Sequence, residues 1–340
     1  MSTVLVTGCA GFIGSHLCER LLADGYRVVG LDNFDPFYDR RIKARNLTRL
    51  WAHPQFSFYE LDLRHGPEAL TALPPGPYDA VVHLAAKAGV GPSLLEPAAY
   101  IDTNILGTTH LLEWIRQHQV PSLLFGSSSS VYGNTPTRPF REDESLMAHC
   151  ISPYAASKLA GEELTYTYHH LYGLRVLVTR FFTVYGPRQR PDLAIHKFAR
   201  RLRAGQSLPV FGDGSTARDY TYVDDIVDGI VRGLAYLAAT PGTYEIVNLG
   251  NSRPVPLLEL IAALGRAAGV TPQLEFLPTQ AGDVDLTYAD ISKAQQLLGY
   301  APCMTLPEGL RRFMSWLDES SVRTTAVRPS GRSLNLVPPL

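Results

Sequence analysis

The stretch TVLVTGCAGFIG, residues 3–14, joins an apolar run to a glycine-rich turn and then to a helical pattern. Residues 3–7 have the composition of a buried strand, and residues 12–23 repeat apolar side chains at helical spacing. Between them, Gly8, Gly11 and Gly14 would let backbone amides approach a pyrophosphate at the positive end of the helix. The turn therefore predicts a dinucleotide site, although a tight strand-to-helix connection alone would also use such glycines.

The second strand-like run, residues 27–32, ends at Asp32, 18 residues after Gly14. A carboxylate at this place can accept both hydroxyls of an adenosine ribose, and it repels the 2′-phosphate of NADP. We therefore expect NAD as the cofactor. The alternative interpretation is that Asp32 only caps a loop.

Strand and helix patterns alternate through the first half of the chain. Parallel strands need long right-handed crossovers, so this alternation predicts an α/β fold with an open, doubly wound parallel sheet. Ligands of such sheets bind at the carboxyl ends of the strands, where Asp62, Leu63, Leu84, Ala85 and Ala86 lie. The further runs are strands at 56–62, 80–84, 122–126 and 175–180 and helices at 101–118 and 153–172.

After about residue 181 the alternation stops, which predicts a smaller domain of mixed structure. We expect a dinucleotide-binding domain over 1–180, to which elements near 220–250 return, a substrate domain over 181–318, and a disordered tail over 319–340. The patterns in the second half are helices near 192–204, 225–239, 257–268, 291–298 and 306–316, strands near 244–248 and 273–276, and Gly/Pro-rich loops at 185–188 and 208–214.

Composition excludes several classes of protein. Lys and Arg number 31 against 32 Asp and Glu, so no net field favours nucleic acid or an anionic membrane. No run of 18 apolar residues occurs, which argues against a membrane span. The chain shows no secretory signal, and its four cysteines have neither metal-ligand nor disulfide-framework spacing. We therefore expect a cytoplasmic protein with no metal site.

Tyr154 and Lys158 lie one helical turn apart in a predicted helix. A phenol has a pKa of roughly 10, and a nearby ammonium together with oxidised nicotinamide would lower the pKa and make the tyrosine a usable base. Four serines, residues 127–130, end the fifth predicted strand, where hydroxyls could contact a substrate. The plain alternatives are a surface Tyr-Lys pair and a serine-rich turn.

Taken together, these motifs resemble the extended short-chain dehydrogenase/reductase family, in its nucleotide-sugar branch, over residues 3–318. The resemblance implies a Rossmann domain followed by a UDP-sugar-binding domain, and a homodimer formed through the helices at 101–118 and 153–172. It also implies that Ser128, Tyr154 and Lys158 are catalytic. The residues expected to bind NAD are Gly8, Gly11, Phe12, Ile13, Asp32, Asn33, Asp62, Leu63, Leu84, Ala85, Ala86, Lys87, Asn104, Tyr154 and Lys158.

Branches of this family differ just before Val131-Tyr132-Gly133. Sugar-nucleotide dehydratases have an Asp-Glu pair there and UDP-glucuronate decarboxylases a Glu, whereas this chain has Ser129-Ser130. The pattern is similar to that of epimerases, which oxidise and re-reduce the sugar. The segments LDNFDPFYD, residues 31–39, and RFFTVYGPRQRPD, residues 180–192, resemble those of UDP-glucuronate 4-epimerases.

The resemblance implies a UDP-sugar substrate and a set of contacts to it. Thr183 and Arg190 would face the sugar and its carboxylate, Arg218 the diphosphate and Asp283 the uridine ribose. The remaining contacts are Ser93, Ser128, Ser129 and Tyr154. Gly91-Pro92 stands where glucuronate epimerases usually have Arg-Tyr, a departure beside the sugar.

The reaction that we expect is the interconversion of UDP-glucuronate and UDP-galacturonate by transient oxidation at sugar carbon 4 with tightly bound NAD. The alternatives are a UDP-glucose 4-epimerase, which would share every catalytic residue, and a UDP-glucuronate decarboxylase, which Ser129-Ser130 disfavours. A more distant one is a non-catalytic dinucleotide-sensing protein, which would need the glycine turn but not the catalytic set.

Overall fold

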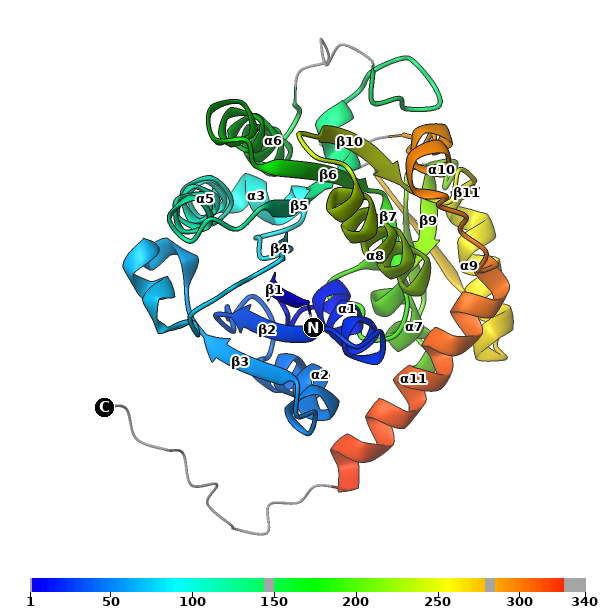
Figure 1. Cartoon of the computed structure of the whole chain (residues 1–340). Coiled ribbons are helices and arrows are strands. Elements are labelled where there is room, and N and C mark those ends of the chain that lie inside the picture. The colour runs from blue at the N-terminus through cyan, green and yellow to red at the C-terminus, as the bar shows by residue number, and fades with distance from the viewer. Residues whose placement is uncertain (1, 144–149, 279–284, 327–340) are drawn as a thin grey trace.

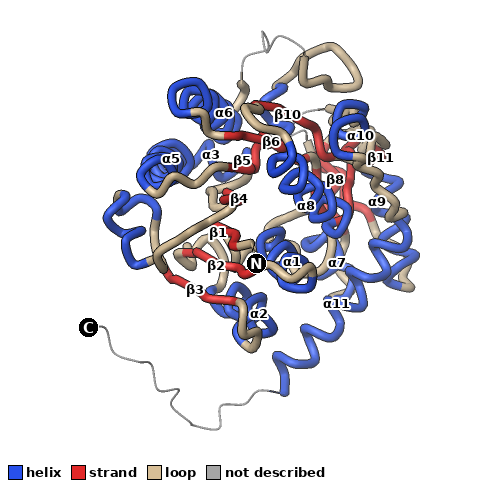
Figure 2. The backbone as a smooth tube through the Cα atoms, in the orientation of Figure 1, coloured by secondary structure: helices blue, strands red, loops and turns tan. Residues whose placement is uncertain are grey.

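A seven-stranded parallel sheet forms the centre of the molecule (Figures 1 and 2). The computed structural model describes residues 2–143, 150–278 and 285–326. The strand order is β10-β6-β5-β4-β1-β2-β3, so the order reverses direction between β1 and β4. The strands are β1 (Thr3–Thr7), β2 (Arg27–Asp32), β3 (Phe56–Glu60), β4 (Ala80–His83), β5 (Ser122–Ser128), β6 (Arg175–Phe181) and β10 (Tyr244–Leu249).

Helices cover both faces of this sheet, and side chains that alternate along the strands pack against them. Val4 and Val6 of β1 face one helical layer, and Leu5 between them faces the other. Because both faces are buried, the strands are apolar throughout, as is typical of parallel sheets. One layer contains α1 (Phe12–Ala23), α2 (Arg40–Trp51) and α8 (Val223–Ala239), and the other α5 (Gly107–Gln117) and α6 (Pro153–Tyr172).

The smaller part of the molecule contains two small sheets. β7 (Thr183–Tyr185) pairs with β9 (Ala217–Tyr222) in parallel, and β11 (Pro254–Pro256) pairs with β9 antiparallel. β8 (Leu208–Phe211) pairs with β12 (Leu274–Leu277) in parallel. The helices here are α7 (Ala194–Arg203), α9 (Leu257–Ala268), α10 (Ser292–Leu298) and α11 (Leu306–Ala326).

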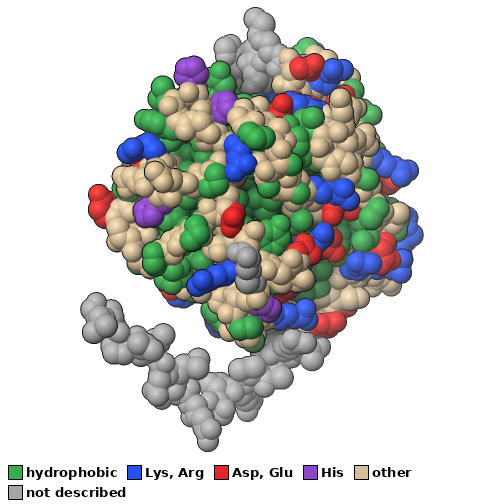
Figure 3. Space-filling view, viewed as in Figure 1, with side chains coloured by type: hydrophobic (Ala, Val, Ile, Leu, Met, Phe, Trp, Pro, Cys, Tyr) green, Lys and Arg blue, Asp and Glu red, His purple; other side chains and the backbone are tan. Residues whose placement is uncertain are grey.

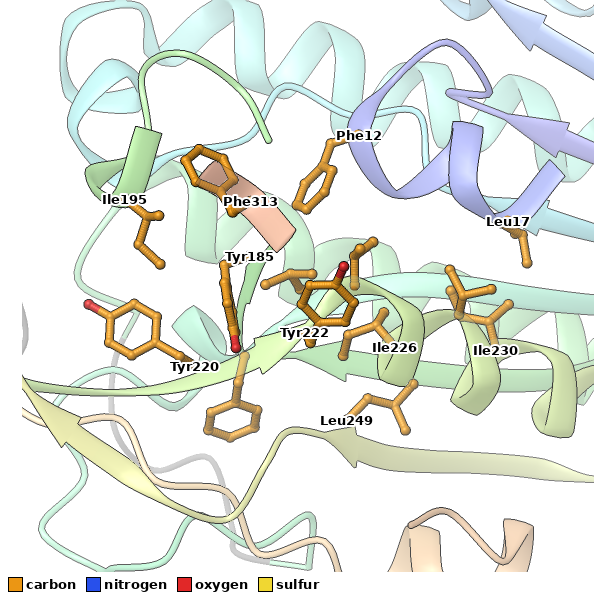
Figure 4. Close-up of a cluster of buried hydrophobic side chains, with 14 of the residues drawn as sticks. Phe12, Leu17, Tyr185, Ile195, Tyr220, Tyr222, Ile226, Ile230, Leu249 and Phe313 are labelled. Carbon is orange, nitrogen blue, oxygen red and sulfur yellow. The ribbon is translucent and has the colours of Figure 1, made fainter. Parts of the chain in front are cut away.

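One apolar cluster joins the two parts. Figure 4 shows Phe12 of α1 near Tyr222 of β9 and Phe313 of α11, and all three side chains belong to the same buried cluster. Leu249 of β10 and Ile226 of α8 extend it onto the large sheet. The glycine turn, which immediately precedes Phe12, is therefore held by packing from both parts.

The predicted fold class is confirmed: a doubly wound parallel sheet is followed by a smaller C-terminal part with a mixed sheet. The run at 101–118 is not one helix, because α4 (Pro97–Ile101) passes through a π-helical segment (Asp102–Leu106) into α5. Short helices also form at Leu63–His65, Pro67–Ala72, α3 (Val90–Leu95) and Ser129–Tyr132.

Other expectations need correction. The loop expected at 208–214 contains β8, because Leu208 and Val210 bury alternate side chains when paired with β12. The disordered tail expected over 319–340 is wrong for its first part, since α11 continues to Ala326; residues 327–340 lie outside the described residues. The polar helix α2 was not expected, and Asp39 caps it by accepting a hydrogen bond from the Arg41 amide.

Within the described ranges, no helix is both long and apolar enough to cross a bilayer. On the face shown in Figure 3, basic and acidic side chains are interspersed, in keeping with a net charge of -1.

Candidate active site

The glycine turn lies at the carboxyl end of β1, at the point where the strand order reverses. Gly8 has a φ of 73°, in the left-handed region that favours glycine. A Cβ on Gly14 would lie 2.2 Å from the Gly8 carbonyl oxygen, and a Cβ on Gly8 would lie 2.7 Å from the Ala85 amide nitrogen. Gly11 is the N-cap of α1 and has no side chain to occupy the amides of the first turn, which includes Phe12 and Ile13. These amides suit an anion such as a pyrophosphate.

Asp32 ends β2 and is almost completely buried. Its Oδ1 accepts hydrogen bonds from the Phe34 amide at 2.8 Å and from Lys43 Nζ at 3.2 Å, and its Oδ2 accepts one from the Ala10 amide at 3.2 Å. Lys43 was not among the residues expected from the sequence, although it is one of only five lysines in the chain. The carboxylate expected to bind the ribose is thus held in position by a buried cation.

Asn33 and Asp62 follow the neighbouring strands β2 and β3. Asn33 Nδ2 donates a hydrogen bond to Asp62 Oδ2 at 3.0 Å, and Asp62 caps the short helix at Leu63–His65. Burial opposes the ionisation of Asp62, but hydrogen bonds from Arg64 and Asn33 outweigh it and hold the pKa of this carboxyl well below its ordinary value. Asn33 and Asp62 thus lie beside Asp32 at the same edge of the sheet.

The loop after β4 contains Leu84, Ala85, Ala86 and Lys87. Asn104 Oδ1 accepts a hydrogen bond from the Lys87 amide at 2.8 Å, and Asn104 Nδ2 donates to the Lys87 carbonyl at 2.9 Å and to Ser157 Oγ at 2.9 Å. Its amide group therefore ties the loop to α6. It can shape a cofactor site through this loop rather than by direct contact.

Ser128, Tyr154 and Lys158 meet at the carboxyl end of β5. Ser128 is the last residue of this strand, and α6 begins beside it at Pro153 with Ser152 as the N-cap. Lys158 is buried, and its Nζ donates a hydrogen bond to the Gly126 carbonyl at 2.7 Å. The structure thus brings together the three side chains expected to be catalytic.

Burial and nearby groups act on the pKa of Tyr154 in opposite directions. Burial raises the pKa of Tyr154, while a hydrogen bond with Ser128 and the positive charge of Arg190 oppose this rise in pKa. Burial lowers the pKa of Lys158 to about 8, and Glu162 opposes that shift. Lys158 donates to the Gly126 carbonyl and is not among the groups that shift the pKa of the phenol in the protein alone, so its expected effect on Tyr154 in the NAD-bound enzyme stays a prediction.

Ser129 and Ser130 form the turn that follows β5. Ser128 Oγ donates a hydrogen bond to Ser130 Oγ at 3.1 Å and accepts one from the Ser130 amide at 3.2 Å. The hydroxyls can hydrogen-bond a sugar oxygen. They cannot supply the carboxyl group that elimination or decarboxylation would use at this place.

The positive charge of Arg190 opposes the rise in the pKa of the Tyr154 phenol. Its Nε and Nη2 donate to the two carboxylate oxygens of Asp192 at 3.0 and 2.8 Å, and Nη2 also donates to the Ala88 carbonyl at 3.2 Å. Phe37, from the loop after β2, lies 5.2 Å from the guanidinium. Arg190 thus connects the β2 loop, the β4 loop and the residues that follow β7. Thr183, the other residue expected at the sugar, is the first residue of β7.

Three further expected substrate contacts have different outcomes. Ser93 is completely buried, and its hydroxyl donates to the Val90 carbonyl at 2.6 Å, so it shows no face to a substrate. Arg218 lies on β9, where Nη1 donates to the Ala217 and Asp285 carbonyls. Asp283 lies outside the described residues. Among the side chains that are described, no cluster of His, Cys, Asp and Glu is placed to hold a metal ion.

These residues fit a bound dinucleotide. The cradle at Gly8 and Gly14 would be filled by any Cβ, the first turn of α1 is free of a capping side chain, and a buried carboxylate ends the next strand. With a Ser-Tyr-Lys set at the neighbouring strand end, fold and site define an enzyme of the extended short-chain dehydrogenase/reductase class.

Comparison with known proteins identifies the family. Residues 4–250 match the sequence model of the NAD dependent epimerase/dehydratase family, and the chain belongs to this family. The UDP-glucuronate 4-epimerase of Thermodesulfobacterium geofontis is 42% identical over 322 residues, which are 94% of this chain and 97% of that protein. The expected NAD dependence is thereby confirmed at the level of the family.

Solved structures agree with this assignment. The crystal structure of the UDP-glucuronic acid 4-epimerase from Bacillus cereus in complex with UDP-glucuronic acid and NAD matches with a TM-score of 0.86 and 35% identity, covering 94% of this chain and 99% of that chain. The UDP-glucose 4-epimerase of Thermotoga maritima with UDP-glucose matches with a TM-score of 0.84 and 33% identity, covering 94% and 99%. Both neighbours are epimerases of UDP-sugars.

Proposed function

We propose that the protein is a UDP-glucuronate 4-epimerase that interconverts UDP-glucuronate and UDP-galacturonate. The observation that carries this proposal is the place of the Arg190 guanidinium. It donates to the Ala88 carbonyl, to which Tyr100 also donates, and the ring of Tyr100 packs against that of Tyr154 at 6.1 Å. A planar guanidinium pairs with a carboxylate through two hydrogen bonds, so a uronate bound there would present its carbon 4 to the phenol. The similarity to UDP-glucuronate 4-epimerases over nearly the whole chain supports the same substrate.

The proposed reaction is an oxidation and re-reduction at sugar carbon 4. The glycine turn and Asp32 would hold NAD, which would supply the hydride acceptor and donor for that carbon. Tyr154 takes the proton of the 4-hydroxyl and later gives it back. Ser128, which hydrogen-bonds the phenol, would also reach the sugar oxygen, and Lys158 would add positive charge and hold the cofactor ribose.

The substrate must turn over between the two hydride transfers without leaving the protein. We assign UDP binding to residues 181–318, with Arg218 at the diphosphate and Asp283 at the uridine ribose, and NAD binding to residues 1–180 together with β10. A remote handle of this kind lets the sugar rotate while it stays in the site. The oxidised uronate is a β-keto acid that loses carbon dioxide readily, and the grip of Arg190 and Thr183 would keep the carboxylate out of the geometry that this loss needs.

We also propose that the enzyme is a cytoplasmic homodimer. Exposed apolar side chains on α4 and the π-helical segment, Ile101 and Leu106, and on α6, Tyr166, Leu171 and Tyr172, support an interface through these helices. Substituting Arg for Ile101 is expected to shift the molecular mass measured by light scattering from dimer to monomer. An unchanged mass would place the interface elsewhere.

The decisive experiment is an assay of the purified protein with UDP-glucuronate and no added NAD. The proposal expects UDP-galacturonate as the product, and expects Tyr154→Phe to keep its NAD while the turnover rate falls by a factor of about 10² to 10⁴. A UDP-pentose would instead show a decarboxylase. Turnover of UDP-glucose alone would show the neutral-hexose epimerase, and no turnover at all would favour a dinucleotide sensor.

A further inference from the structure

A buried ion pair lies one helical turn beyond Lys158. Glu162 of α6 and Arg180 of β6 each expose only 2% of their side chain. Arg180 Nε donates to Glu162 Oε1 at 3.0 Å, and Arg180 Nη2 donates to Glu162 Oε2 at 2.7 Å. Apolar residues often stabilise a fold as well as a buried ion pair does, so stability alone does not explain this pair.

The pair connects the helix and the strand that carry the catalytic groups. Tyr154, Lys158 and Glu162 follow one another at intervals of four residues on one face of α6. On the strand side, Ser127 of β5 is in register with Arg180, and Ser127 Oγ donates a hydrogen bond to Glu162 Oε1. Glu162 therefore holds the residue that immediately precedes Ser128.

Glu162 also acts on the charge of Lys158. Burial lowers the pKa of this lysine, and Glu162 is the group that opposes the shift. His83 also faces Lys158, but burial lowers the pKa of His83 to about 3, so it adds no charge near neutral pH. The titratable groups that face Lys158, Tyr154 and the ion pair from the surrounding elements are His83, Tyr100, Tyr132, Cys150, Arg190 and Tyr244.

We propose that Glu162 is a positioning residue for the reaction: held by Arg180, its carboxylate fixes Ser127 beside Ser128 and places an anion one helical turn from the ammonium of Lys158. This inference rests on the proposed function, because it assigns Glu162 a part in the proton transfer by Tyr154. Arg180 acts one step further away, by holding both carboxylate oxygens of Glu162.

The first test is Glu162→Gln, which preserves the shape of the side chain and removes its charge. We expect kcat for UDP-glucuronate to fall at least tenfold above pH 8 while KM stays within about twofold. The alkaline limb of the kcat profile should move to lower pH by about one unit, because Lys158 loses its proton more readily without the anion. The matched control is Glu163→Gln, the neighbouring exposed residue on the same helix, which should leave the profile in place.

A second variant separates positioning from folding. Glu162→Gln leaves Arg180 buried without a counter-charge and so lowers stability, whereas Glu162→Gln with Arg180→Met removes both charges. We expect the double variant to melt close to the wild type and still show the shifted profile. A double variant with the wild-type profile would mean that Glu162 only balances Arg180. If neither variant folds, the pair is needed for folding itself. A wild-type profile in the double variant and a failure of both variants to fold would each overturn the proposal.

A readout without turnover completes the test. In the NAD-loaded protein, the ultraviolet absorbance of the phenolate reports the ionisation of Tyr154 when the spectrum of the matching Tyr154→Phe protein is subtracted. The Tyr154 signal should appear at higher pH in the Glu162→Gln protein, because Lys158 loses its proton at lower pH there and then no longer favours the phenolate. A wild type without activity on UDP-glucuronate would refute the proposed function, whereas an active wild type with unmoved titration and kcat profiles in the variants would refute the role of Glu162.

Discussion

The guanidinium of Arg190 forms a two-point ion pair with Asp192, two residues further along the chain, with N–O distances of 3.0 and 2.8 Å. These are the same donors that we propose for the carboxylate of the substrate. The Asp192 carboxylate therefore occupies the two guanidinium donors that a uronate would use. Binding of the substrate would replace the Asp192 carboxylate with the carboxylate of the sugar.

This competition predicts that Asp192→Asn binds UDP-glucuronate more tightly. The amide leaves the guanidinium without an internal anion, so we expect Kd to fall about three- to tenfold, which corresponds to about 1 kcal/mol. Calorimetry with UDP-glucuronate and UDP-glucose measures the effect, and the neutral sugar should change little. The control is Asp143→Asn, which removes an exposed pair of the same two-residue spacing with Arg141. Weaker binding of the uronate would mean that Asp192 holds Arg190 in its working position.

Arg190 itself should decide both affinity and product. With Arg190→Ala, we expect KM for UDP-glucuronate to rise by a factor of about 10 to 100 and a UDP-pentose to appear, because a loosely held keto acid can reach the geometry for loss of carbon dioxide. Arg190→Lys keeps the positive charge but not the planar guanidinium, so its KM and its pentose yield should lie between those of the wild type and of Arg190→Ala. Chromatography of the products checks this, and an alanine variant with unchanged KM and no pentose would exclude the role.

The glycine turn gives a steric prediction. In Gly14→Ala the new Cβ would lie 2.2 Å from the Gly8 carbonyl oxygen, so the turn must open. We expect the purified protein to lose its NAD and to become less stable by about 1–3 kcal/mol, as for other overpacked sites. Gly91→Ala is the control, since its Cβ would meet no atom within 4 Å. The absorbance of released cofactor measures the NAD content. Full NAD content in the Gly14 variant would show that binding of the cofactor does not depend on the tight turn at Gly8 and Gly14.

His83 predicts how stability depends on pH. It is buried between Thr7 and Thr108, and burial lowers its pKa from 6.5 to about 3. Between these values the unfolded chain binds a proton that the folded protein does not, so stability falls as pH drops below about 6.5, by at most about 1.4 kcal/mol per unit.

His83→Gln should therefore make stability less dependent on pH. In urea unfolding, the loss of free energy between pH 7 and pH 5 should be smaller by up to about 2 kcal/mol in this variant. His170→Gln, at an exposed histidine, should leave the loss unchanged. Equal losses in the His83 variant and the wild type would show that His83 is protonated in the folded state.

Much of the fold could be predicted because its signals are local. The alternation of apolar runs and helical patterns from residue 3 to residue 180 predicted the parallel sheet, and Gly8, Gly11 and Gly14 predicted a tight turn at the carboxyl end of β1. The exceptions are elements whose stability comes from a distant partner. β8 lies in a Gly/Pro-rich segment and exists because β12, more than sixty residues later, pairs with it.

The sequence alone determined the order of the elements, the family and the side chains at the strand ends, because periodicity, turn glycines and the Tyr154–Lys158 spacing act over a few residues. Only the tertiary structure decided which charges meet: Lys43 with Asp32, Arg180 with Glu162, and Arg190 with Asp192. The physical reason is that burial and charge act through space, so they depend on the register of strands and on the packing of helices that are distant in the chain.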